Sequence, residues 1–151
     1  MDLPAKNSGR DRGLSYAFVV TRKLLIVVLA IAFAIECAFA ACGFAAPSFT
    51  LTTFHVGITP DTLFLGHVVA WCLLAVAIAA GLALRWVLAR KRAGYTLSIA
   101  LGLWWVGIGV ALAVKFGRYE NLALDALKGA LLALFAWLEQ RAASPSRDDV
   151  A

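Results

Sequence analysis

Four long apolar stretches limit what this chain can fold into. They run from about Leu24 to Phe44, Leu63 to Leu84, Thr96 to Val114 and Leu122 to Leu138. A helix needs about 20 apolar residues to cross the hydrocarbon core of a bilayer. Inside lipid, backbone polar groups must bond to one another, which a helix achieves within itself. We therefore predict an all-α fold, an integral membrane four-helix bundle with one domain over residues 24–138.

The composition supports a membrane protein. Of 151 residues, 62% are apolar and 15% are charged, whereas a soluble domain has about 45–50% and about 25%. The mean hydropathy is +0.84. The net charge of +5 comes mainly from basic residues that flank the apolar stretches. We therefore expect the lipid bilayer as a partner and no nucleic acid.

The distribution of basic residues predicts the orientation. The loop between the first two stretches has no basic residue, and the loop between the last two has Lys115 and Arg118. The positive-inside rule then places both termini in the cytoplasm. This predicts an N-in/C-in protein of the bacterial inner membrane, with a cytoplasmic basic tail (1–23) and a cytoplasmic polar tail (139–151). Eleven of the fourteen basic residues lie on that side: Lys6, Arg10, Arg12, Arg22, Lys23, Arg85, Arg90, Lys91, Arg92, Arg141 and Arg147.

Local signals predict where helices begin and end. The N-terminal tail is expected to be flexible and to become helical near Tyr16. Pro47 is expected to end the first helix, with a loop over 48–59. Residues 59–61, Thr-Pro-Asp, have the capping hydroxyl, early proline and early acid that favour a helix start. Gly94 is expected to act as a breaker before the third span.

Two alternatives concern the ends of the bundle. The last stretch is short and contains Asp125 and Lys128, so it could lie in the interface as an amphipathic helix. The end of the first stretch, up to Cys42, is similar to a cleavage site. Its long leader and the presence of Glu36 favour an uncleaved first helix.

Four ionisable residues fall within the predicted spans: Glu36, His67, Asp125 and Lys128. A charge in the hydrocarbon region costs about 2.5–3.5 kcal/mol on insertion scales, so each needs a structural or functional reason. At a rise of 1.5 Å per residue, Glu36 and Lys128 lie at about the same depth, roughly 12 Å below the outer end of their spans. All four are predicted in the outer half of the bundle.

The spacing of Asp125 and Lys128 places both on one helix face. Asn121 extends this face upward, and Leu132 and Glu139 extend it downward. We expect the face to point into the bundle, where Glu36 could neutralise Lys128. Two interpretations remain: an ion-pair cluster that fixes packing and register, or a proton-titrating or ligand-binding pocket open to the outer side.

Aromatic and catalytic patterns add few predictions. Trp71, Trp104 and Trp105 are expected to pack between helices or to form a ligand platform. The two histidines are not on facing mid-bundle positions, so haem ligation is not predicted. With three cysteines and no C-x-x-C, neither a zinc site nor a disulfide framework is indicated. We predict no cofactor, no metal site and no catalytic residue.

Several motifs resemble those of known membrane protein families. The layout from about Leu24 to Leu138 resembles the small four-helix bacterial proteins of the DoxX-like and BphX-like kind. The residues that carry this resemblance are the Pro47 break, Gly57-Ile58-Thr59-Pro60, the turn Arg90-Lys91-Arg92 with Gly94, and Asp125-x-x-Lys128-Gly129. Many such proteins have Arg where this chain has His67. The resemblance implies a fold and a membrane location rather than a reaction.

Glu36 in the first span and Trp105-Val106-Gly107-Ile108-Gly109 in the third are similar to features of small multidrug resistance exporters. In that family the glutamate exchanges protons for a cationic substrate. This chain is longer, and its fourth span carries Asp125 and Lys128.

Three functions follow as hypotheses. The first is a non-enzymatic accessory subunit of a membrane complex, or a lipid- or ligand-binding bundle, with other membrane subunits or a second copy as partners. The second is a proton-coupled small-molecule transporter in which Glu36 titrates. The third is a membrane enzyme that acts on a lipid or quinone.

Overall fold

The computed structural model describes residues 8–53, 56–120 and 122–143, which form helices joined by short connections and contain no strand. This confirms the all-α prediction. Helix α1 is followed by a short α2, and α3 and α4 are joined by a tight turn. A π-helix, η1, leads directly into α5. The bounds are α1 Ser8–Ala45, α2 Pro47–Thr53, α3 Pro60–Leu88, α4 Arg92–Phe116, η1 Leu122–Ala126 and α5 Leu127–Ala142.

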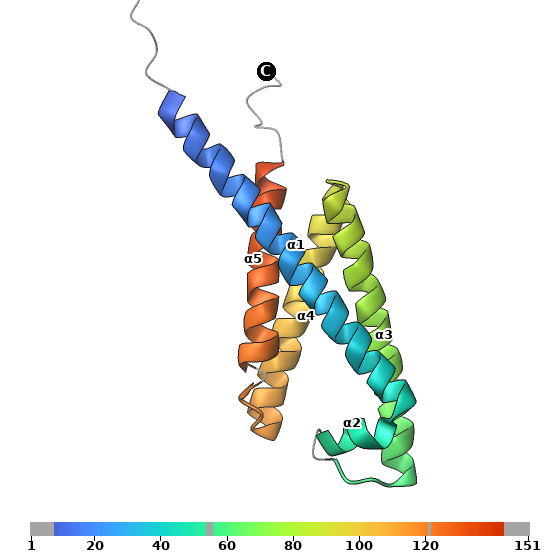
Figure 1. The fold of residues 1–151 in the computed structure, drawn as a ribbon. Helices are drawn as coiled ribbons and strands as arrows, with labels where there is room; N and C mark the ends of the chain where they lie inside the picture. The colour runs from blue at the N-terminus through green and yellow to red at the C-terminus, as the bar shows by residue number, and fades with distance from the viewer. Residues whose placement is uncertain (1–7, 54–55, 121, 144–151) are drawn as a thin grey trace, which may run out of the picture.

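The helices alternate in direction, so that α1 and α4 run one way and α3 and α5 return (Figure 1). Helix α1 crosses the bundle obliquely, packing against α3 and α5, while α5 packs along α4. The start of α1, the α3–α4 turn and the end of α5 all lie at the same end of the bundle. Helix α2 folds across the opposite end, which we call the α2 end.

Three helices are long and apolar enough to cross a membrane. They cover Val20–Ala45 in α1, Pro60–Leu88 and Arg92–Lys115. These correspond to the first three predicted spans and are compatible with a multipass membrane protein. Helix α5 has 16 residues and continues from the five-residue η1.

Small residues make up much of the buried interior, together with a few large side chains such as Leu25, Leu29 and Leu132. The buried positions of α3 are Gly66, Ala70, Ala77, Ala80, Ala83 and Val87. Large side chains such as Phe64, Trp71 and Val114 are exposed. In water this distribution would be costly, but lipid chains are as apolar as leucine, and small residues let membrane helices approach closely. The surface therefore fits a hydrocarbon environment.

Two glycines mark a close approach between α4 and α5. A Cβ atom added to Gly102 would lie 2.6 Å from the carbonyl oxygen of Gly129, and a Cβ on Gly129 would meet the carbonyl oxygen of Gly102. A side chain at either position would force the two backbones apart. These glycines hold α5 against α4 and thereby place the charged residues at the start of α5.

The predicted start of α3 is confirmed. The Thr59 hydroxyl accepts a hydrogen bond from the Thr62 backbone N–H at 3.2 Å, and the Thr62 hydroxyl accepts one from the Thr59 N–H at 2.7 Å. Pro60 is the first helical residue and Asp61 lies in the first turn. This reciprocal capping satisfies donors that a helix start otherwise leaves unpaired.

Three other local predictions were wrong. Helix α1 begins at Ser8 rather than near Tyr16. Residues 47–53 form α2 rather than a loop, because Pro47 begins a new helix and the Thr50 and Thr52 hydroxyls bond back to carbonyls one turn earlier. Gly94 lies within α4, where it permits a close approach to α3: a Cβ there would lie 2.6 Å from the Val87 nitrogen.

Replacement of Gly102 by alanine is expected to lower the free energy of unfolding by about 1–3 kcal/mol, because the α4 and α5 backbones must separate. Thermal unfolding of the purified protein in detergent measures this. Gly107→Ala is the matched control, since no atom lies within 4 Å of a Cβ built there, and alanine favours a helix by about 0.5–1 kcal/mol. Equal losses in both variants would contradict the close contact.

Candidate functional site

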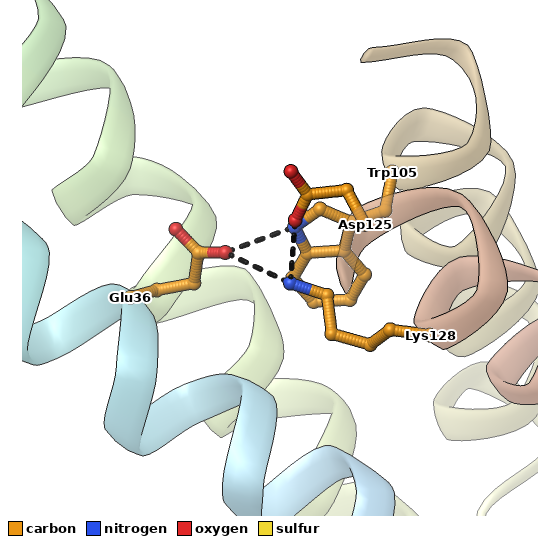
Figure 2. A network of polar contacts seen from close by, with 4 residues as sticks. All are labelled: Glu36, Trp105, Asp125 and Lys128. Carbon is orange, nitrogen blue, oxygen red and sulfur yellow. Dashed lines mark hydrogen bonds and ion pairs between the residues drawn. The ribbon is translucent and has the colours of Figure 1, made fainter. Parts of the chain in front are cut away.

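Four polar side chains from four elements meet inside the bundle (Figure 2). The indole N–H of Trp105 in α4 donates a hydrogen bond to Glu36 Oε1 in α1 at 2.9 Å. The Lys128 ammonium in α5 lies 3.6 Å from the same Oε1 and 3.0 Å from Asp125 Oδ1 in η1. We call these four residues the Glu36 network.

The network is buried at its centre and more open toward η1. Glu36 is 5% exposed and Trp105 is 3% exposed. The Lys128 ammonium also lies 4.5 Å from the centre of the Trp105 ring. An ammonium over an indole face is attracted by the negative charge of the π system. Trp105 therefore contacts both charges, donating its N–H to the carboxylate and presenting its ring to the lysine.

The Glu36 network contains more negative than positive groups. Two carboxylates, Glu36 and Asp125, face one ammonium, that of Lys128. Charges removed from water are stable only with close partners, and a buried group left without its partner costs several kcal/mol. The arrangement can therefore do two things chemically: it can hold α1 against α4 and α5, and it can bind one further proton or cation.

The π-helix places Asp125 in the network. η1 is one wide turn, Leu122–Ala126, and Asp125 is its fourth residue. Lys128 follows three residues later in α5, which allows the ion pair along one helix face. π-Helical turns are rare and often occur at functional sites. Sequence patterns of apolar residues do not distinguish such a turn from an α-helix.

The structure brings Glu36, Asp125 and Lys128 together but leaves His67 outside the network. His67 is on the exposed surface of α3, and its Nδ1 lies 2.9 Å from the Leu63 carbonyl oxygen one turn earlier. Its exposed position on α3 keeps it apart from Glu36, Asp125 and Lys128.

The three tryptophans that were predicted together lie in different environments. Trp71 is 65% exposed and packs edge to face against Phe44 of α1, with ring centres 5.1 Å apart. Trp104 is 55% exposed, whereas its neighbour Trp105 is buried and hydrogen bonded. The hydrogen bond from Trp105 was missed at the sequence level, where the residue is grouped with the packing aromatics. Trp105 lies on one buried face of α4 with Ser98 and Leu101. Such spacing indicates burial in the sequence but does not reveal the hydrogen bond.

The helix face predicted to run from Asn121 to Glu139 is only partly observed as one continuous face. Asn121 lies outside the described residues, and Leu132 is buried on this face. Glu139, 8% exposed, lies at the other end of the bundle and forms part of a second polar junction. There Arg22 of α1 donates hydrogen bonds to the carbonyls of Val87 and Leu88 at the end of α3.

Glu139 has an unusual electrostatic environment. Burial raises the pKa of its carboxyl above the ordinary value, while the positive charges of Arg22 and Arg90 oppose that shift. Within the described part of the chain, Glu139 Oε1 and Arg22 Nε are buried without hydrogen-bond partners. Arg22 was predicted to lie in the N-terminal tail, so this junction was not predicted.

Two open grooves lie on the outside of the bundle. The α3/α4 groove, of about 330 Å³, is formed by Ala75, Val76, Ala79, Leu97, Ala100, Leu101 and Trp104. The α1/α5 groove, of about 290 Å³, is formed by Val28, Ile31, Ile35, Ala123, Leu124, Leu127, Lys128 and Leu131. The first has only apolar side chains, and the second reaches the Glu36 network through Lys128.

Comparisons with known proteins found no match, either to a family model, to a curated protein or to a solved structure. The resemblance to DoxX-like and BphX-like proteins therefore stays a prediction.

Replacing Trp105 with phenylalanine removes the N–H that Glu36 accepts while keeping an aromatic ring near Lys128. We expect the free energy of unfolding in detergent to fall by about 1–3 kcal/mol, the cost of leaving a charged acceptor without its partner. Trp104→Phe is the matched control, because Trp104 is exposed and outside the network. It should change stability by about 0.5 kcal/mol or less. Equal effects of the two substitutions would show that the hydrogen bond contributes nothing.

Proposed function

We propose that this protein is a non-catalytic accessory subunit of a larger membrane complex. The observation that carries the proposal is that the polar side chains face inward while an outer groove is apolar. The polar groups of the Glu36 network bond to one another inside the bundle, whereas the α3/α4 groove presents apolar atoms outward. Such a protein meets its partners through packing within the hydrocarbon layer.

The α3/α4 groove fits a transmembrane helix of another subunit. Its walls come from two membrane-capable helices, so its occupant must itself be stable in lipid. Ala75, Ala79 and Ala100 give it a shallow floor of small side chains. Small residues let a second helix approach closely and gain van der Waals contact. Trp104 at the groove provides a large side chain against which that helix can pack.

The proposed membrane placement follows the charges. We propose that η1 and α5 as far as Leu138 form a fourth span, and that both termini face the cytoplasm of a bacterial inner membrane. The antiparallel packing of α5 on α4 supports the fourth crossing. The concentration of basic residues at the end holding the α3–α4 turn supports the orientation.

A photoreactive phenylalanine analogue placed at Trp104 tests the accessory role in intact cells. We expect one defined membrane protein to cross-link at Trp104, and the same protein to co-purify with the unmodified chain in stoichiometric amount in mild detergent. Leu103 is the matched control position, adjacent and exposed but outside the groove. Cross-links from Trp104 only to lipid or to a second copy would refute the accessory role.

A second candidate function rests on the unequal charge of the Glu36 network. Two carboxylates share one ammonium, and the α1/α5 groove connects Lys128 with the bundle surface. We propose as the alternative a transporter in which a proton on Glu36 exchanges for a cationic substrate entering by this groove. The proton and the cation would then compete for the same excess negative charge.

Flux measurements in proteoliposomes test the alternative. With tetraphenylphosphonium as the probe and a pH-sensitive dye inside, transport predicts proton movement coupled to uptake of the cation. Glu36→Gln should abolish it, because the amide cannot release a proton. Glu139→Gln is the control, a buried carboxyl outside the network. Coupled flux that persists in Glu36→Gln would remove this function.

A further inference from the structure

Six exposed basic side chains gather at one end of the bundle. They come from every long helix: Lys23 from α1, Arg85 from the end of α3, Arg90 and Lys91 from the turn, Arg92 from the start of α4, and Arg141 from the end of α5. We call them the basic patch. Glu139 is the one acidic side chain described at this end, and it is buried. At the α2 end, by contrast, acidic and basic side chains are balanced: Asp61, Lys115, Arg118 and Glu120.

Tertiary contacts hold these helix ends together. Arg22, beneath the patch, donates a hydrogen bond to the Leu88 carbonyl at 3.1 Å and so ties α1 to the end of α3. Gln140 donates one to the Thr96 hydroxyl at 3.1 Å, which ties the end of α5 to the start of α4. The patch is therefore a fixed arrangement contributed by the folded bundle.

The α3–α4 turn contains a conformation in which arginine is unusual. Arg90 has a φ of 54°, and its position just after the end of α3 is usually occupied by glycine. The Lys91 N–H closes the turn by bonding to the Trp86 carbonyl at 2.8 Å. A glycine would meet this backbone requirement without strain, whereas Arg90 adds an exposed positive charge to the turn.

We propose that the basic patch binds the headgroups of anionic phospholipids. The patch lies at the ends of membrane-capable helices, and Arg141 stacks at 3.8 Å on Trp137, a residue type that sits at headgroup level. Guanidinium groups form paired hydrogen bonds with phosphate oxygens. Basic side chains clustered directly beyond a membrane helix attract anionic lipid. Neither Lys91 nor Arg92 forms an ion pair with another described side chain.

Native mass spectrometry of the full chain in detergent tests the proposal, with phosphatidylglycerol and phosphatidylethanolamine of identical acyl chains as probes. We expect preferential binding of phosphatidylglycerol. Lys91→Gln with Arg92→Gln should lower that affinity by about tenfold or more, with little change for phosphatidylethanolamine. Lys115→Gln with Arg118→Gln removes two charges at the α2 end and should leave the preference intact.

Arg90→Gly is a second variant, and it is expected to fold normally because glycine suits the backbone conformation at this position. It should weaken phosphatidylglycerol binding while the melting temperature stays the same or rises. Equal affinity for the two lipids would overturn the proposal and leave the patch to an acidic protein or nucleic acid. A loss of preference as large in the control double variant as in Lys91→Gln with Arg92→Gln would overturn it as well.

Discussion

A carboxylate buried among membrane helices must be compensated, and the rest of this bundle is arranged around that requirement. Glu36 is buried within the membrane-capable segment of α1, where apolar neighbours offer no hydrogen bond. Its compensation comes from two other helices: the Trp105 N–H from α4 and the Lys128 ammonium from α5. Neither contact can form unless α1 packs at the right rotation and depth. The polar network thus selects one arrangement of helices whose apolar surfaces alone would permit several.

The small residues of the core make this compensation possible. Gly102 and Gly129 bring the α4 and α5 backbones into contact, so that Trp105 and Lys128 project from neighbouring positions toward α1. The polar groups then fix the register, while the glycines and alanines fix the spacing. Many other large apolar side chains, such as Phe64, Trp71 and Val114, face outward.

The sequence predicted the three long apolar helices and much of the Glu36 network. It failed where the rotation of a helix about its axis decides which side chains meet. Length and hydropathy predict helices, and a rise of 1.5 Å per residue was enough to match Glu36 with Lys128 in depth. Depth does not determine the direction in which a side chain points. His67 was therefore grouped with residues it does not meet. Trp105 was treated as a packing residue because hydropathy does not register its N–H, and the π-helical turn around Asp125 has no apolar period of its own.

A double-mutant cycle between Glu36→Gln and Lys128→Met tests most directly whether the network joins α1 to α5. Unfolding free energies would be measured in detergent for the unmodified protein, both single variants and the double variant. The contact at 3.6 Å predicts a coupling free energy of about 1–3 kcal/mol, with the double variant less destabilised than the sum of the singles. Additive effects, within about 0.5 kcal/mol, would contradict the account.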